Sequence, residues 1–475
     1  MKGMTAFVCI SDIDLDIIEE SMSLFSRAKG TFVRRQRTES PLARFFGSGW
    51  GVAIICAVVS LSVLSAIVWA GWRDPVVPPL DTVGSEGLTE SEEETVELVP
   101  TEGLYFSGNS YGDDCTVCGH SRFADVVVIP SYYEGRPVVG IGVSAFSEYW
   151  LNGNTDGKKP ITEVILPDTL VRIWDRAFFG CHSLKSIHIP ASVTMIHPSA
   201  FQECTGLERI TVDENNPVYH AEGNCLIETA TGTVIAGCRN SVIPEDGSVK
   251  AISEYAFYKN TTLTEINIPA SVTEIPKNGF YGCFSLAYVD GGEGLVVIGD
   301  HAFEMCTELT SFTFSETVKH IGTDAFRNCH SLTEVVLPRV MTYLGCQAFM
   351  ECPSLIRIEL PASVESLCPQ VMESSAIITI TVPEGYTNLN TMLDSCKSLT
   401  TVYLPSTLTK INDMEFIRCY ALTDIYFNGT LEQWLAITQR DQSWMASVGE
   451  WTLHCTDGVT QWRYDRGYGM RQVNK

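Results

Sequence analysis

The chain repeats one short unit, and this repeat restricts the possible folds more than any other feature of the sequence. The unit, small-Phe-x-x-Cys-x-x-Leu-x-x-(Ile/Val)-x-(Ile/Leu), is clearest at residues 325–337. Because so short a unit cannot bury its apolar face alone, the repeat predicts a solenoid in which successive units stack. The period is 23 residues, with one step of 56 and one of 21, and the column is Phe178, Phe201, Phe257, Phe280, Phe303, Phe326 and Phe349, with Met372, Leu393 and Phe416 as weaker members.

Within a unit, the apolar residues follow the spacing of a leucine-rich repeat. Leu332, Val335 and Leu337 stand at i, i+3 and i+5, which places the last two on one face of a short strand. A Pro often follows, as Pro338 does, and ends the strand because it lacks an N–H donor. We therefore predict a β-rich solenoid, a right-handed leucine-rich repeat coil with short parallel strands in each 23-residue repeat, preceded by one transmembrane helix.

A cysteine column accompanies the Phe column, and Asn260 takes its place in one unit. A small side chain suits a tight inward turn, where it can meet backbone groups. Coils about 4.8 Å apart would hold these side chains parallel, which disfavours disulfides. We predict that both columns are structural and that the column cysteines are buried thiols: Cys181, Cys204, Cys283, Cys306, Cys329, Cys352, Cys396 and Cys419.

On this frame the chain resembles the bacterial BspA-like leucine-rich repeat family, over roughly residues 120–457. The family repeat P-x-x-V-x-x-I-x-x-x-A-F-x-x-C-x-x-L-x-x-I-x-I-P is matched by residues 338–361 and, allowing for an insertion, by residues 190–269. The insertion itself, at 223–238, and the ending at 428–434 also look like segments of this family. The resemblance implies a cell-surface protein that adheres to proteins of a host or of neighbouring cells.

The residues before the repeats indicate a membrane anchor. Residues 45–72 carry no charge, and a segment of that length can cross a hydrocarbon core of about 30 Å. Basic residues precede this segment, so we expect a cytoplasmic segment at 1–46, a transmembrane helix at 47–72 and the remainder outside the cell membrane. A cleavable signal peptide ending near Ala70 is the alternative.

The remaining composition suggests four further segments. Residues 73–103 are acidic and poor in large apolar residues, which predicts a disordered tether. Residues 104–160 form an N-terminal cap with a first imperfect repeat, and residues 161–427 hold the BspA-like repeats. Residues 428–475 form a C-terminal cap and tail, with a helix near 431–438 and fraying after about 457.

Two cysteine pairs leave alternatives open. In the insertion at 213–250, two β-prone runs flank residues 230–232, which predicts a hairpin that pairs Ile227 with Ala236 or a near neighbour. This hairpin brings Cys225 and Cys238 toward one rung, either as a disulfide or as two unpaired thiols. In the N-terminal cap, the Cys-x-x-Cys pair at 115–118 could form a disulfide, stay as thiols or hold zinc, although a second pair of ligands is missing.

Charge and motifs then limit the function. A net charge of −25 argues against nucleic acid as a partner, and no recognisable catalytic, metal or cofactor motif is present, so we expect a protein without enzymatic activity. We predict a membrane-anchored binding or adhesion module for extracellular protein or glycan ligands. The alternative is a single-pass sensor or regulatory protein whose cytoplasmic segment binds a partner. The candidate ligand-binding residues flank the inward strand positions: Lys185, His188, Glu265, Asn267, Thr313, Glu334, Arg357 and Glu359.

Overall fold

The computed structural model describes residues 99–108, 113–120, 124–147, 160–364, 368–412, 414–438, 448–465 and 469–473. The expected cytoplasmic segment at 1–46, the transmembrane helix at 47–72 and most of the tether at 73–103 lie outside these residues. Across the described ranges, no helix is both long and apolar enough to cross a membrane. Residues 95–475 belong to one compact unit.

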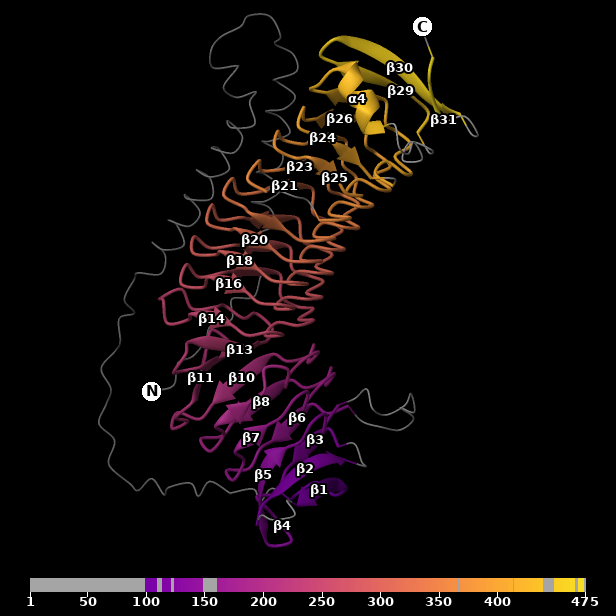
Figure 1. Ribbon diagram of the computed structural model, residues 1–475. Helices are drawn as coiled ribbons and strands as arrows, with labels where there is room; N and C mark the ends of the chain where they lie inside the picture. The colour runs from indigo at the N-terminus through magenta and orange to yellow at the C-terminus, as the bar shows by residue number, and fades with distance from the viewer. Residues whose placement is uncertain are drawn as a thin grey trace, which may run out of the picture. The chain divides into compact units, whose positions relative to one another are not determined.

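The repeats form a parallel β-solenoid of about 13 turns, whose coils follow one another from the N-terminal to the C-terminal cap (Figure 1). One strand of each coil contributes to a first row, row A. Most neighbours in row A pair in parallel, many of them 23 residues apart as Val289 and Phe312 are, and the middle residue points into the core. Row A comprises β3 (Val126–Val128), β6 (Glu163–Ile165), β8 (Ser186–Ile189), β10 (Arg209–Val212), β15 (Glu265–Asn267), β17 (Tyr288–Asp290), β19 (Ser311–Thr313), β21 (Glu334–Val336), β23 (Arg357–Glu359), β24 (Thr379–Thr381), β26 (Thr401–Leu404), β28 (Asp424–Phe427) and β29 (Glu450–Cys455).

A second row of strands, row B, forms between each row A strand and the next Phe of the column, at a pair of apolar residues such as Val272 and Ile275. Most of its strands have two residues, of which the second is buried, as Ile298 and Ile321 are. Two residues give too little alternation to be recognised as a strand in sequence, and row B was not predicted. Row B comprises β5 (Arg136–Ile141), β7 (Arg172–Ile173), β9 (Met195–Ile196), β14 (Ala251–Ile252), β16 (Glu274–Ile275), β18 (Val297–Ile298), β20 (His320–Ile321), β22 (Tyr343–Leu344), β25 (Asn388–Leu389) and β27 (Lys410–Ile411).

The Phe column lies in the turn that follows row B. The ring of Phe303 stacks on Phe280 and Phe326 with centroids 5.1 and 5.3 Å apart, and all three side chains are fully buried. His301 and Met305 flank this Phe with positive φ angles of 56° and 63°, a conformation that costs non-glycine residues energy. It turns the amides of both residues toward the carbonyl oxygens of Thr323 and Arg327 in the next coil, at 2.9 and 2.8 Å. Hydrogen bonds between coils therefore offset the backbone strain.

The thiols of the cysteine column link each coil to the preceding one. The Cys306 thiol donates to the carbonyl oxygen of Phe280 at 3.3 Å, and the Cys329 thiol donates to that of Phe303 at 3.4 Å. Where Cys is replaced, the replacement makes an equivalent bond: Asn260 Nδ2 donates to Cys238 O and Ser375 Oγ donates to Phe349 O, both at 2.9 Å. The column position therefore requires a small hydrogen-bond donor.

The insertion adds a three-stranded antiparallel sheet, β11 (Tyr219–Glu222), β12 (Cys225–Glu228) and β13 (Thr233–Gly237), and β13 pairs in parallel with β14 of row B. Ile227 pairs with Val234, and a bulge beside it pairs Leu226 with Ala236. The hairpin packs so tightly that a Cβ on Gly237 would lie 2.0 Å from Cε1 of Phe257. Only glycine allows this approach.

Both faces of the hairpin are buried, because it divides the core into two hydrophobic clusters. Leu226, Ala236 and Cys238 belong to the N-terminal cluster, while Cys225 and Val234 belong to the C-terminal one. No disulfide joins the two thiols. Cys225 Sγ donates to Gly223 O at 3.7 Å, and Cys238 Sγ donates to Asn224 O at 3.3 Å. Of the two alternatives for this pair, the structure favours unpaired thiols.

The N-terminal cap consists of β1 (Leu104–Gly108), β2 (Cys115–His120) and β4 (Tyr132–Tyr133). Cys115 and Cys118 stand three residues apart on a strand, so one side chain is buried and the other is exposed. This separation argues against a local disulfide or a shared metal. His120 stacks on Phe146 with ring centroids 5.5 Å apart, and Phe146 in turn stacks on Phe178, the first residue of the Phe column.

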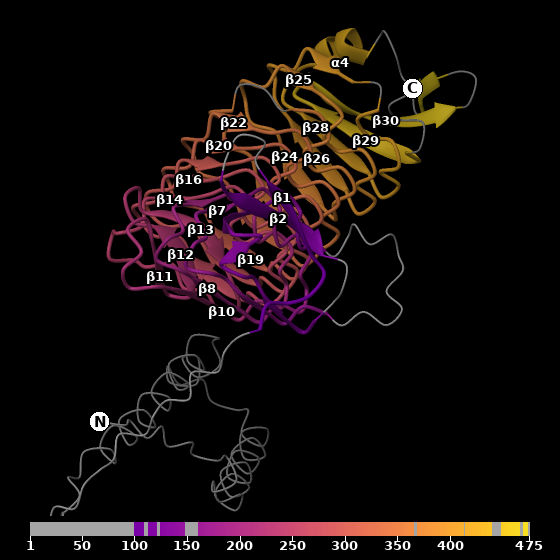
Figure 2. The ribbon, with the colours of Figure 1, turned by 90° about the horizontal axis from the view of Figure 1, so that it is seen from below.

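The C-terminal cap contains α4 (Leu431–Thr438), β30 (Gly458–Asp465) and β31 (Gly469–Gln472). Figure 2 shows α4 and β30 at the same end of the solenoid as β29. Thr430 and Gln433 form a reciprocal capping box that begins α4. The expected fraying after residue 457 was wrong, because β30 and β31 extend the sheet of β29 as antiparallel strands. Trp451 and Trp462 of this sheet stack with centroids 6.2 Å apart.

Candidate functional site

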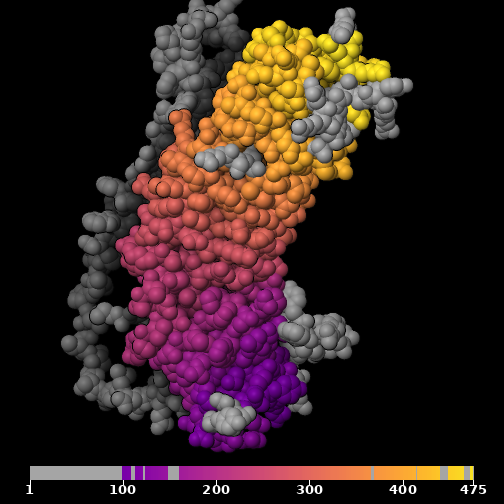
Figure 3. Space-filling model, in the orientation of Figure 1, coloured from indigo at the N-terminus to yellow at the C-terminus, as the bar shows by residue number. Residues whose placement is uncertain are grey.

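The outward side of row A is the candidate binding surface, and we call it the ladder face. It consists of the first and third residue of each row A strand, because the middle residue points inward. Figure 3 shows one side of the stacked coils as a continuous surface from cap to cap. Exposed aromatic and aliphatic side chains interrupt its polar residues, among them Tyr288, Val336 and Tyr403.

The structure places seven of the eight predicted ligand-binding residues on the ladder face, and Lys185 directly precedes β8. All eight are exposed. They do not converge on one point but extend along successive coils: His188 on β8, Glu265 and Asn267 on β15, Thr313 on β19, Glu334 on β21, and Arg357 and Glu359 on β23.

Several of these residues already bond to neighbouring coils. Lys185 Nζ lies 3.1 Å from Glu208 Oε1, and His188 Nδ1 lies 3.0 Å from Thr211 Oγ1. Asn267 Nδ2 donates to Glu245 Oε1 at 3.3 Å. Arg357 bridges Glu334, at 2.9 Å, and Glu359. These exposed pairs contribute little to stability and remain available to exchange partners.

Two hollows indent the ladder face. The N-terminal hollow has a volume of about 440 Å³ and lies over β6, β8 and β10, with Glu163, His188 and Arg209 on its wall. The C-terminal hollow has a volume of about 430 Å³ and crosses β24, β26, β28 and β29. Its lining includes Tyr403, Tyr426 and His454, whose rings occupy one column on successive strands.

This aromatic column is ordered by stacking and by one charged contact. The Tyr403 and Tyr426 rings stack with centroids 4.7 Å apart, and Tyr426 and His454 stack at 4.1 Å. His454 Nε2 lies 2.8 Å from Asp424 Oδ1, and this contact lowers the pKa of the Asp424 carboxyl. The column was missed in the sequence, although the 23-residue spacing of Tyr403 and Tyr426 shows it.

A second carboxylate, Glu384, fixes the rim of the C-terminal hollow. It accepts hydrogen bonds from the Ser406 amide at 2.9 Å and from Asn428 Nδ2 at 2.6 Å. These donors lower the pKa of Glu384, the Ser406 amide most strongly. The side chain therefore joins three successive coils and stays ionised at neutral pH.

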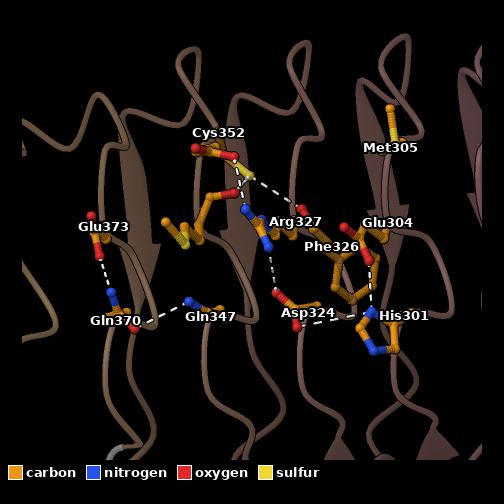
Figure 4. A network of polar contacts seen from close by, with 12 residues as sticks. His301, Glu304, Met305, Asp324, Phe326, Arg327, Gln347, Cys352, Gln370 and Glu373 are labelled. Atoms are coloured by element: carbon orange, nitrogen blue, oxygen red, sulfur yellow. Dashed lines mark hydrogen bonds and ion pairs between the residues drawn. The ribbon is translucent and has the colours of Figure 1, made fainter.

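The polar side chains of the Phe turns form a separate network on another side of the coils (Figure 4). His301 Nδ1 lies 2.6 Å from Glu304 Oε2, and Arg327 lies 3.5 Å from both Asp324 and Glu351. In the turns that follow, Gln347 donates to Gln370 at 3.1 Å. Each contact lies within a turn or joins adjacent turns, so the network stabilises the stack. No group of His, Cys, Asp and Glu in the described ranges is arranged to hold a metal ion.

The predicted structural residues lie in the core. The seven Phe side chains are at most 8% exposed, and seven of the eight column cysteines are buried, while Cys204 is partly exposed. Burial raises the pKa of the Cys283 and Cys352 thiols to about 12, which makes them poor nucleophiles.

The family comparison agrees with this arrangement. The profile described as "BspA type Leucine rich repeat region" matches residues 156–231, 235–354 and 319–436, with six copies. The chain belongs to the BspA-type leucine-rich repeat family. The matched residues cover the coils between the two caps, including the Phe and cysteine columns that carried the resemblance in the sequence.

Three solved structures align with most of this BspA-type chain. A leucine-rich cell surface protein from Faecalibacterium prausnitzii is 23% identical, with 72% of this chain and 98% of that chain covered and a TM-score of 0.42. A leucine-rich repeat protein from Bacteroides ovatus is 22% identical, with 73% and 98% covered and a TM-score of 0.40. The pneumococcal vaccine antigen PcpA is 14% identical, with 74% and 96% covered and a TM-score of 0.42. No curated protein matches the chain.

Proposed function

We propose that this chain is a binding module of the cell surface, anchored by residues 47–72, which presents the ladder face to extracellular protein or glycan ligands. The supporting observation is the ladder face itself. Parallel sheets are usually covered on both sides, yet row A leaves one side open over many coils. Such an extended open surface suits the recognition of large ligands rather than the enclosure of a small one.

The composition of the ladder face supports recognition. Tyr288 and Tyr403 are 39% and 41% exposed, and the Arg357 side chain is 59% exposed. Tyrosine and arginine are the residue types that contribute most at protein interfaces, because they combine apolar area with hydrogen-bonding groups. The acidic excess of the chain favours ligands without strong negative charge.

A binding screen tests this proposal. The full-length chain is presented to panels of extracellular matrix proteins, cell-surface proteins and glycans, and each ligand found is measured against Arg357→Glu and Tyr288→Ala. We expect at least one of these ladder-face variants to weaken binding about tenfold or more. The matched controls, Lys410→Glu and Tyr343→Ala, change exposed residues of row B and should bind normally. Equal loss in both sets, or no ligand in any panel, would contradict the proposal.

The proposed topology has its own test. The basic residues before residue 47 favour a cytoplasmic N-terminus. Protease added to intact cells should therefore remove the repeats and leave a small fragment in the membrane. Repeats that resist protease on intact cells but not on lysed cells would show that they lie inside.

A further inference from the structure

We propose that the C-terminal hollow binds a neutral glycan, with one pyranose ring stacked on the free ring face of Tyr403. The inference rests on the proposed function, because it assigns a ligand class to one part of the ladder face. It is carried by the aromatic column, by Thr381, which lies next to Tyr403 on β24, and by the polar groups of the rim.

The stack of aromatic rings ends at Tyr403, because the next strand has no aromatic residue at the same position. Tyr426 covers one face of the Tyr403 ring, at an interplanar angle of 18°. The other face points toward β24, where the partner of Tyr403 in the column is Thr381. A threonine side chain is too small to cover a six-membered ring, and Tyr403 remains 41% exposed. A flat slot therefore lies above Thr381, beside an aromatic face.

A sugar ring has the shape and polarity of this slot. One side of a pyranose presents C–H groups with small positive charges, and the face of an aromatic ring carries negative potential, so the two attract. The sugar hydroxyls at the ring edge need hydrogen-bond acceptors, and Glu384 and Asn428 lie on the wall of the same hollow. The carboxylate of Glu384 already accepts four hydrogen bonds, from Ser406, Thr407 and Asn428, so a sugar hydroxyl would bond to the amide oxygen of Asn428 or replace one of these donors.

The charges around the hollow favour a neutral glycan. None of its lining residues is Lys or Arg, and the chain carries a net charge of −25. Sialylated or sulfated sugars would therefore enter a negative field without a cation to bind them. A cationic peptide is less suited, because Asp424 is paired with His454 and Glu384 is engaged by four donor groups of its neighbours.

The N-terminal hollow provides an internal comparison. It lies on the same face and has nearly the same volume, but the residues at the corresponding column positions are Ile165, His188 and Thr211, and no stacked pair of rings is present there. A ligand that requires only a hollow on the ladder face would not distinguish the two sites. A ligand that stacks on Tyr403 would bind the C-terminal hollow and not the N-terminal one.

The test uses the full-length chain and four variants. Binding is measured to neutral oligosaccharides ending in mannose, galactose or N-acetylglucosamine, to sialylated and sulfated counterparts, and to oligolysine. We expect a neutral oligosaccharide to bind, Tyr403→Ala to weaken it about tenfold, and Thr381→Trp to block it by filling the slot. Tyr403→Phe keeps the ring and should bind, and Tyr343→Ala, which changes an exposed tyrosine of row B, should bind as the unchanged chain does.

Three outcomes would overturn the inference: glycan binding that survives both Tyr403→Ala and Thr381→Trp, binding restricted to anionic glycans, or binding of oligolysine alone. Circular dichroism of each variant shows whether it is folded. If the chain binds protein ligands through Arg357 but no glycan, the glycan site is wrong and the proposed function stands. If it binds neither class, both are wrong.

Discussion

Lys259 Nζ lies 2.5 Å from Glu203 Oε1, although the two residues are 56 positions apart. They stand at equivalent places in the Phe turns on either side of the insertion, two residues after Phe201 and Phe257. The two side chains thus bridge the two turns, while the end of β13, at Gly237, packs against the ring of Phe257. The Glu203 side chain is only 5% exposed, so this ion pair is the charged contact that joins the two halves at the turn.

Removing the lysine should weaken that junction. Lys259→Met removes the ammonium group that contacts the buried Glu203 carboxylate, and we expect a loss of about 2 kcal/mol or more in unfolding free energy, measured by urea denaturation. Adding Glu203→Gln should recover part of the loss. The exposed pair of Lys185 and Glu208 is the control, since Lys185→Met should cost less than about 1 kcal/mol. Equal effects of the two lysine substitutions would contradict this account.

Phe303→Ala should be among the most damaging substitutions. The ring is fully buried between Phe280 and Phe326, and truncation of a buried Phe costs about 3–5 kcal/mol. Because each coil contacts only its neighbours, the lesion should also uncouple the flanking coils and broaden thermal unfolding. Tyr288→Ala, an exposed aromatic on row A, serves as the control. A melting curve like that of the unchanged chain would place Phe303 outside the core.

The cysteine column should tolerate a hydroxyl better than an aliphatic group. Cys329→Ser keeps a donor for the Phe303 carbonyl, as Ser375 does for Phe349, whereas Cys329→Val removes it. We expect Val to be less stable than Ser by about 1 kcal/mol in urea denaturation. The same comparison at the exposed Cys118 should show no difference. A valine variant as stable as the serine variant would mean that packing alone selects the residue.

The column thiols should be unreactive in the folded chain and free in the unfolded one. Burial raises the pKa of Cys306, Cys329 and Cys396 well above that of an ordinary thiol, so few thiolates form. Alkylation without reductant should be slow in buffer and should reach all eight column cysteines after denaturation, as read by peptide mass. Residues that stay unlabelled after denaturation would be oxidised and would refute the prediction.

Glu415 should make the C-terminal coils less stable at higher pH. Glu415 takes the place of the small residue that precedes the Phe in other units. The amide of Thr391 donates to one oxygen of its carboxyl group at 2.6 Å. Burial raises the pKa of Glu415 from 4.5 to about 8. Between these values the folded chain holds a proton that the unfolded chain releases. Stability should therefore be fully present below about pH 4.5 and fall as pH rises toward 8, by up to about 1.4 kcal/mol per pH unit.

Glu415→Gln tests this dependence, because the amide cannot ionise. Urea midpoints measured from pH 5 to pH 8 should decline for the unchanged chain and decline less for the variant. Glu359→Gln, at an exposed position, is the matched control and should leave the slope unchanged. Parallel slopes for all three proteins would show that Glu415 is ionised at every pH examined.

The sequence predicted those parts of the fold that repeat with large apolar side chains. Val335 and Leu337 alternate on one strand, and a period of 23 places each Phe above the last, so row A and the core followed directly. Row B was missed because two residues provide no alternation. The positive φ of Met305 was also missed, since methionine has no preference for it, although Gly282 and Asn328, which likewise stand two residues after a Phe, show that the turn needs that conformation.

The candidate site was predicted in place but not in detail. Alternation alone put His188, Glu265 and Glu359 on the outward side of row A, where the structure has them. It could not show that Tyr403 and Tyr426 stack, because that depends on ring orientation across strands. The place of His454 in the column could not be predicted from the sequence, because β29 lies beyond the last repeat and the 23-residue spacing does not extend to it.

The hairpin of β12 and β13 also divides the solenoid into two parts, each with its own apolar core. Because the two hydrophobic clusters are separate, the coils on one side of the hairpin do not rely on the core of the other side. Local unfolding that starts in one part should therefore stop at the hairpin and leave the other part folded.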